Sequence, residues 1–183
     1  MGQTDIPLSP LGERQAKQVA ARLATAGLFA VYSSDLSRAR ETGLAVAQAA
    51  GVPLHLEPRL REVAGGTWTG LSLGEVQAKD AALFAHWRKD PMGIPLAGGE
   101  SYRQVMERAW AAFDEIVARH RGGKVALIGH GGSLRTILLK VLGLDHFPSG
   151  YFELSNAGVS LVEVRETGPV LVYMNSTCHL ELA

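Results

Sequence analysis

One stretch of the chain joins an apolar strand to a helix through glycines and a histidine: Lys124-Val-Ala-Leu-Ile-Gly-His130-Gly-Gly-Ser-Leu-Arg135. Residues 124–128 form a nearly continuous apolar run, which is typical of a strand buried in a parallel sheet. Apolar residues then recur at helical spacing up to Gly143, at Leu134, Ile137, Leu138 and Val141. The sequence therefore predicts a strand, a glycine-rich turn and a helix, with His130 in the turn.

Strand and helix patterns alternate along the rest of the chain. Ser9, Ser72 and Ser101 predict the starts of helices, the last two as capping boxes, and Gly27 and Gly51 predict helix ends. The remaining predicted strands are 29–33, 54–56, 159–164 and 170–174. This alternation predicts an α/β domain with a mainly parallel central sheet, to which the two late strands add an antiparallel edge.

Composition limits the kind of protein. A chain of 183 residues with 46% hydrophobic residues is long enough for one core, so a single domain over residues 1–183 is expected. Eighteen Lys and Arg balance eighteen Asp and Glu, which argues against nucleic acid as a partner. No apolar run approaches the roughly 20 residues of a membrane helix, and the single Cys178 excludes an internal disulfide. A cytoplasmic protein without membrane contact is the resulting expectation.

His130 is the first candidate for chemistry. It ends a predicted strand and precedes a helix whose free backbone N–H groups favour an anion, and flanking glycines allow a ligand close to the backbone. The helix dipole disfavours a protonated imidazole unless an anion is bound. The alternative is a histidine that only satisfies its neighbours at a turn.

Arg38 and Glu62 are two further candidates. Arg38 and Arg40 follow the strand 29–33 in the first turns of a helix that is expected to begin with a cap at Ser34 or Asp35. Two residues apart, they point to different faces, so only one should face the site, and we expect that to be Arg38. The alternative is a solvated surface arginine.

Glu62 precedes a glycine-rich stretch that holds Trp68, which suits a partly desolvated carboxyl acting as a general acid. An ordinary surface charge is the alternative. Other catalytic signatures are missing: the chain has no Gly-x-Ser-x-Gly, Walker or Gly-x-Gly-x-x-Gly motif. The remaining histidines lack ligand spacing, so neither a metal site nor a cofactor is predicted.

Five segments in order resemble the histidine phosphatase superfamily, the phosphoglycerate-mutase-like proteins. They are Asp5-Ile-Pro-Leu-Ser-Pro-Leu-Gly12, Ser34-Asp-Leu-Ser-Arg38-Ala-Arg-Glu-Thr42, Leu60-Arg-Glu62 with Gly66-Thr-Trp-Thr-Gly70, Gly98-Gly-Glu-Ser101 and Gly129-His-Gly131. The resemblance spans the chain and implies a three-layer α/β/α fold. It also implies hydrolysis of a small phosphorylated metabolite through a phosphohistidine.

The resemblance assigns roles residue by residue. It implies that Arg38 clamps phosphate, that His130 is the family's second histidine, which stabilises the transferring phosphoryl group, and that Glu62 is the general acid that later activates water. Substrate contacts are implied for four more residues: Gly2, Gly131, Gly132 and Asn156.

The sequence departs from the family at the nucleophile. No Arg-His-Gly occurs in the 183 residues, and the matching first strand would lie before Met1, so the domain is expected to be N-terminally incomplete. A misassigned start, a strand supplied by a partner and a real loss of catalysis are the three explanations. The chain is expected to fold poorly alone and to bind phosphate with little turnover.

Three functions therefore stay open. A phosphomonoester hydrolase is favoured over a noncatalytic phosphoester-binding protein. A phosphoglycerate mutase is disfavoured because mutases usually carry Asn after His-Gly, where this chain has Gly132, and because the middle segment is compact. A homodimer also stays open.

Overall fold

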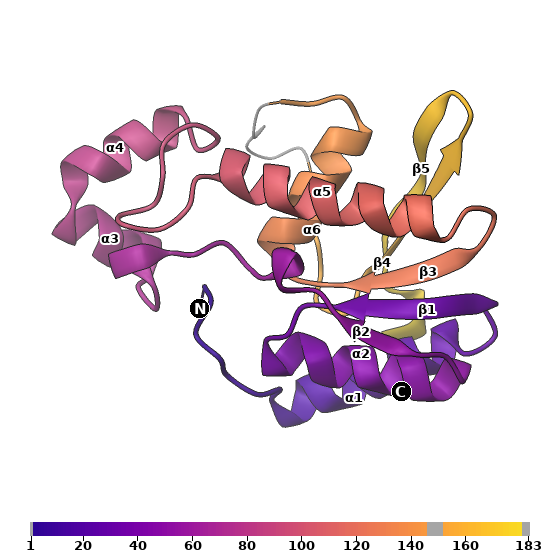
Figure 1. The fold of residues 1–183 in the computed structure, drawn as a ribbon. Coiled ribbons are helices and arrows are strands. Elements are labelled where there is room, and N and C mark those ends of the chain that lie inside the picture. Colours follow the sequence, from indigo (N-terminus) through magenta and orange to yellow (C-terminus); the bar gives the residue numbers. More distant parts are fainter. Residues whose placement is uncertain (1, 146–151, 181–183) are drawn as a thin grey trace.

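The structure, a computed structural model, describes residues 2–145 and 152–180. Its central sheet contains three parallel strands in the order β2 (Leu54–Leu56), β1 (Leu28–Ser33) and β3 (Lys124–Ile128). Helices α1 (Pro10–Leu23) and α2 (Ser37–Ala50) cover one face, and α5 (Tyr102–Arg119) and α6 (Gly131–Val141) cover the other (Figure 1). The expected three-layer α/β/α architecture is confirmed.

The central strand β1 supplies both halves of the core. Ala30 and Tyr32 pack with α5 and α6, whereas Val31, which points to the opposite face, packs with α1 and α2. This alternation follows from the two-residue period of a strand. Because a strand covered on both faces has no solvent side, all of its residues from 30 to 33 are buried.

Capping residues place most helices where the sequence predicts them. The Ser9 hydroxyl accepts from the Gly12 amide at α1, and full capping boxes form at Ser72 and Ser101. The predicted cap of α2 is wrong. The side chains of Ser34 and Asp35 contact His130 and Arg61 and do not cap the helix. The Ser37 amide at the start of α2 instead donates to Asp5 Oδ1 at 2.7 Å.

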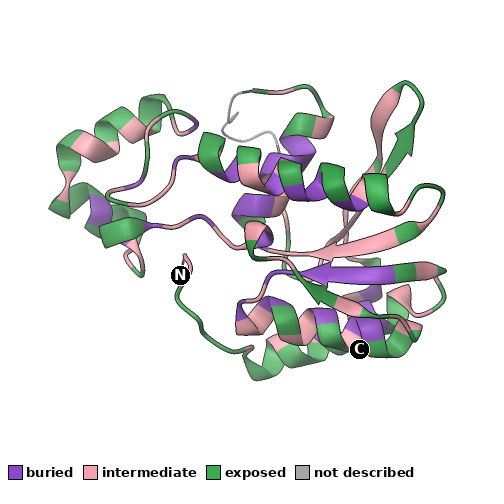
Figure 2. Cartoon of the chain, viewed as in Figure 1, coloured by how far each residue is buried: buried purple, intermediate pink, exposed green. Residues whose placement is uncertain are grey.

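The prediction that β3 is buried is also wrong. None of its residues is buried, although four of the five are apolar. The strand pairs with β1 on one side, and no described strand pairs with its other edge. Figure 2 shows the contrast between the buried β1 and the half-exposed β3. An apolar strand is therefore left at an open edge of the sheet.

The late strands do not form the predicted antiparallel edge of the central sheet. β4 (Val159–Arg165) and β5 (Gly168–Ser176) pair with each other as a separate two-stranded sheet. Side chains of this hairpin still reach the main core: Val162 packs with the cluster that includes Leu127, and Val159 with the cluster that includes Ala126. The hairpin and β3 thus share a core without sharing backbone hydrogen bonds.

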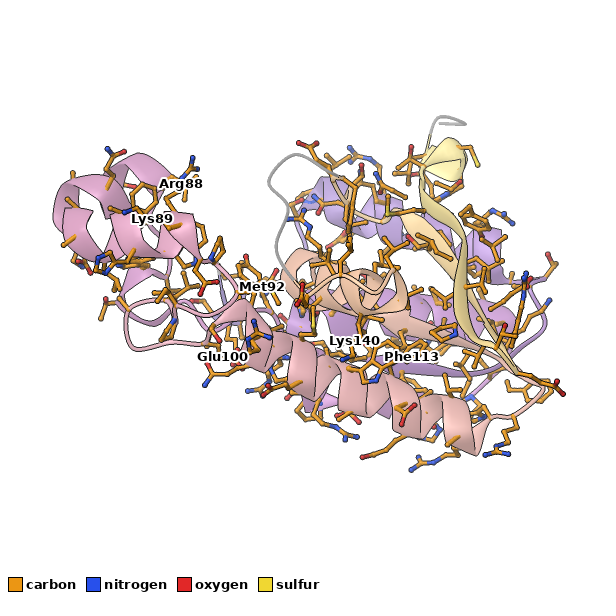
Figure 3. All side chains as sticks on the ribbon, turned by 90° about the horizontal axis from the view of Figure 1, so that it is seen from above. Arg88, Lys89, Met92, Glu100, Phe113 and Lys140 are labelled. Carbon is orange, nitrogen blue, oxygen red and sulfur yellow. The ribbon has the colours of Figure 1, made fainter. Side chains whose placement is uncertain are left out.

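Helices α3 (Leu73–Lys79) and α4 (Ala81–Lys89) extend away from the sheet (Figure 1). The helix predicted to begin at Ser72 ends at Asp80, where φ is −145° and ψ is 54°. No residue of α4 is buried, and Arg88 and Lys89 at its end lie away from α6 (Figure 3). Three short 3-10 turns complete the described elements: η1 (Pro58–Leu60), η2 (Gly66–Trp68) and η3 (Cys178–Leu180). No helix in the described ranges is long and apolar enough to cross a membrane.

Candidate active site

The carboxyl ends of β1 and β3 bring His130 and Ser34 together. The strands run parallel, so their ends meet at one edge of the sheet, and the Ser34 amide donates to the Ile128 carbonyl at 2.9 Å. The Nε2 atom of His130 then lies 2.9 Å from the Ser34 hydroxyl. Both side chains are buried, with exposed fractions of 8% and 0%. His130 is held at the edge of the sheet where ligands of such folds bind.

The surroundings of His130 disfavour its protonation. Burial, followed by the positive charges of Arg38 and Arg108, lowers the pKa of His130 to about 4. The residue also stands at the N-cap of α6, where the helix dipole acts in the same direction. The site without a ligand therefore holds a neutral imidazole beside cationic groups. A bound anion would reverse this balance.

Glu62 reaches the start of the same helix. Its Oε1 accepts from the Gly132 amide at 3.0 Å and from the Val63 amide at 2.8 Å. A Cβ at position 132 would lie 2.1 Å from Glu62 Oε1, so a side chain there would displace the Glu62 carboxylate from the Gly132 amide. The structure thus brings the predicted acid and the predicted anion-binding helix into contact, and it gives Gly132 a steric reason to be glycine.

Arg38 and Gly2 are also brought together. The guanidinium of Arg38 donates to the carbonyls of Gly2 at 2.8 Å and Thr4 at 2.9 Å, while Arg40 is exposed. Gly2 has a φ of +53°, in the left-handed region that favours glycine. The Gln3 side chain in turn donates to the Glu62 carbonyl at 2.9 Å. Residues 2–4 therefore lie between Arg38 and the segment that carries Glu62.

The other two sequence candidates, Gly131 and Asn156, take no part in the hydrogen bonds described for His130 and Glu62. Gly131 is the first residue of α6 and is exposed, with no heavy atom near the position of a Cβ. Asn156 lies in an exposed turn before β4, and the hydrogen bonds described for His130 and Glu62 do not involve it. Within residues 2–145 and 152–180, no group of three or more His, Cys, Asp or Glu side chains is placed to hold a metal ion.

Comparisons with known proteins identify the family of this chain. The sequence matches the family model of the histidine phosphatase superfamily (branch 1) over residues 1–177. The chain belongs to this superfamily. Phosphoserine phosphatase 1 of Hydrogenobacter thermophilus is 32% identical over 98% of this chain and 85% of its own length. "Probable phosphoglycerate mutase GpmB" of Yersinia pestis is 31% identical over 99% of this chain and 86% of its own.

Solved structures of superfamily members show the same fold. YhfR of Bacillus stearothermophilus superposes with a TM-score of 0.89 at 28% identity, covering 98% of this chain and 90% of its own. A histidine-to-alanine mutant of phosphoserine phosphatase from Entamoeba histolytica, solved with phosphoserine, gives a TM-score of 0.87 at 27% identity. That match covers 98% of this chain and 89% of the mutant. By its relatives, this histidine phosphatase superfamily chain is an enzyme of the phosphatase type.

Three residues around the site were not predicted from the sequence: Ser34, Arg108 and Glu100, whose carboxylate accepts hydrogen bonds from Arg108 and the Ala64 amide. Ser34 and Glu100 lie inside two segments that carry the superfamily resemblance, but neither segment reveals what its side chain contacts. Arg108 follows Glu107 on α5 and looks like one of several solvated charges on that helix. It donates to three backbone carbonyls 46 to 49 positions away and to Glu100 eight positions away, so local sequence carries no signal for these contacts.

Proposed function

We propose that this protein supplies the phosphate clamp, the charge-stabilising histidine and the general acid of a phosphomonoester hydrolase that works through a phosphohistidine. One observation carries the proposal: Glu62 contacts the first turn of the helix that His130 caps, within a site where two arginines act on the His130 charge. Phosphoryl transfer depends mainly on positioning and on stabilising charge, which these groups provide.

The steps follow from the chemistry of each group. Arg38 and His130 bind oxygens of the phosphoryl group, and the negative charge of the substrate favours uptake of a proton by His130. A nucleophilic histidine nitrogen forms the N–P bond as the ester O–P bond breaks, and Glu62 gives its proton to the leaving oxygen. Glu62 then takes a proton from water, which attacks phosphorus and breaks the N–P bond, so that phosphate leaves and both residues return to their first state.

The nucleophile requires a further strand. Described residues offer an unpaired edge on β3, and the β4–β5 hairpin packs into the same core without pairing to it. A parallel strand on that edge would end beside His130, because carboxyl ends of parallel strands meet at one edge of a sheet. We infer that a strand ending in Arg-His-Gly occupies this edge in the active form.

The noncatalytic alternative needs the same site without that strand. The Entamoeba mutant structure supports binding by such a site, because that protein is seen with phosphoserine although a histidine is replaced by alanine. The mutase alternative is disfavoured by Gly132, because mutases usually carry asparagine after His-Gly. Hydrolysis therefore stays the preferred function, and a small phosphomonoester the preferred substrate class.

The experiment compares residues 1–183 with the same chain carrying an added strand that ends in Arg-His-Gly before Met1. Both are assayed for phosphate release from phosphoserine, phosphoglycerate and p-nitrophenyl phosphate. We expect release only from the extended chain, and none when the added histidine is replaced by alanine. An extended chain that folds and binds phosphate, yet releases none from any ester, would favour the binding protein.

A further inference from the structure

Arg108 makes an unusual number of contacts for one side chain on α5. Its Nε donates to Glu100 Oε1 at 2.7 Å, and its Nη2 donates to Glu100 Oε2 at 2.9 Å. Three backbone carbonyls accept its remaining N–H groups: Arg59 at 2.6 Å, Arg61 at 2.8 Å and Glu62 at 3.0 Å. All five donors of the guanidinium are thus used, and they converge on the residues around Glu62.

Glu100, which lies just before α5 (Figure 3), extends this contact past Glu62. Its Oε2 accepts from the Ala64 amide at 2.9 Å, and its own amide donates to the Ala64 carbonyl at 2.8 Å. Burial alone would raise the pKa of Glu100, but the hydrogen bonds from Arg108 and the Ala64 amide hold it below its usual range. The Arg108–Glu100 ion pair therefore binds the backbone before Glu62, at Arg61, and after it, at Ala64.

This pair is not needed to hold α5 in place. The helix is already anchored by its apolar face, which includes Val105, Ala109 and Phe113. In contrast, the segment from Arg61 to Gly65 has no helix or strand of its own to fix its backbone. Arg108 and Glu100 supply four long-range hydrogen bonds to the backbone of this segment, from which the Glu62 side chain extends to Gly132, and the Gln3 side chain supplies another to the Glu62 carbonyl.

We propose that Arg108 and Glu100 are positioning residues for Glu62, fixing its backbone so that the carboxylate meets the Gly132 amide at the start of α6. The catalytic consequence rests on the proposed function, since it assumes that Glu62 is the general acid. The positional claim does not, because it concerns the unliganded chain. Lysine at position 108 would keep the charge but lose the planar fork that reaches three carbonyls and a carboxylate together.

Arg59 provides a matched control. Its guanidinium also binds two carboxylates, those of Glu57 and Glu115, and it lies in the same stretch of chain. Its side chain makes no described contact with residues 61–64. Arg59→Gln therefore removes a comparable ion-pair network without releasing the segment around Glu62.

The test is the amide resonance of Gly132 in residues 1–183, measured by NMR for Arg108→Lys, Glu100→Gln, Arg59→Gln and the reference variant Glu62→Gln. We expect Arg108→Lys and Glu100→Gln to shift this resonance toward its position in Glu62→Gln, and Arg59→Gln to leave it in place. If Arg108→Lys does not fold, Glu100→Gln decides alone. An unchanged Gly132 resonance in folded Glu100→Gln or Arg108→Lys overturns the proposal.

The catalytic consequence is measured separately in the chain extended with the Arg-His-Gly strand. There Arg108→Lys should lower kcat by up to about 10²-fold, the loss that a 1 Å misplacement of a reacting group can cause, while KM changes little. A shifted Gly132 resonance with unchanged kcat would keep the positioning role and refute Glu62 as the general acid. An extended chain without activity would refute the proposed function and leave the resonance test standing.

Discussion

The folded surroundings of His130 keep its imidazole neutral over a pH range in which an exposed histidine is protonated. In the unliganded site its pKa lies at about 4, because of burial and then the charges of Arg38 and Arg108, whereas an exposed histidine has a pKa near 6.5. Between these values the unfolded chain binds a proton that the folded chain does not. The folded state is therefore fully stabilised above the unfolded pKa of about 6.5, and this stabilisation is lost as the pH falls toward the folded pKa of about 4.

The stability of residues 1–183 should thus decrease as the pH is lowered from about 7.5 to 4. The His130 share of this loss is on the order of 3 kcal/mol, from a shift of roughly 2.5 pKa units at 1.36 kcal/mol each. Urea unfolding over this range measures it, with His130→Gln as the comparison. A constant difference in the free energy of unfolding between the two proteins at every pH would contradict the depressed pKa.

Gly131 and Gly132 are neighbours that differ in their surroundings, so they form a matched pair. Gly132→Ala should displace the Glu62 carboxylate from the amide and lower the free energy of unfolding by about 1–2 kcal/mol. Gly131→Ala meets open space and should raise it by about 0.5 kcal/mol. Chemical denaturation of both variants checks this, and equal effects would mean that Glu62 does not occupy the start of α6.

At the scale of single residues, sequence reasoning found the groups whose chemistry is local. His130 and Arg38 follow strands directly, so their place at the edge of the sheet could be predicted from the order of elements. Ser34 and Arg108 act through partners 96 and 46 to 49 positions away, which no local pattern encodes.

The helices differ in how firmly they are tied to the core. The α5 helix has six buried residues and a buried cap at Ser101, whereas α3 has one, Val76, and an exposed capping box at Ser72. Loss of a cap costs about 1 kcal/mol in either helix. Loss of the α5 cap should destabilise the whole domain, whereas loss of the α3 cap should destabilise α3 and its neighbour α4 alone.

Ser101→Ala should therefore lower the free energy of unfolding by about 1 kcal/mol, seen as a lower midpoint of urea unfolding. Ser72→Ala should mainly speed amide exchange within α3 and α4. Hydrogen exchange read residue by residue separates the two effects. A global loss in Ser72→Ala as large as that in Ser101→Ala would show that α3 and α4 unfold together with the sheet.

Element prediction succeeded where short-range signals determine the outcome. Serine caps located the starts of α1, α3 and α5, Gly51 located the end of α2, and apolar runs located every strand of the two sheets, whereas α1 ends at Leu23, before the predicted Gly27. It was wrong where a distant group intervened. Asp5 caps α2 from 32 residues away, and β3 is half-exposed because its burial depends on a neighbour that the described chain does not supply.

For the whole molecule, the decisive feature is an α/β/α sheet in which the edge of β3, next to the β4–β5 hairpin, has no described strand paired to it. His130 and Ser34 lie at the edge where β1 and β3 end, so a nucleophile on a strand paired with β3 would lie beside them. Binding and chemistry should therefore separate: Arg38, His130 and Glu62 hold phosphate in residues 1–183, and the covalent step needs the additional strand.

The covalent intermediate itself tests this separation. Residues 1–183 and the chain extended with an Arg-His-Gly strand are mixed with a phosphomonoester labelled with radioactive phosphorus, quenched rapidly and assayed for protein-bound phosphate that is labile to acid and stable to base. We expect such a phosphohistidine only in the extended chain, on the added histidine. Stoichiometric labelling of residues 1–183 alone, or labelling of His130 in either protein, would contradict it.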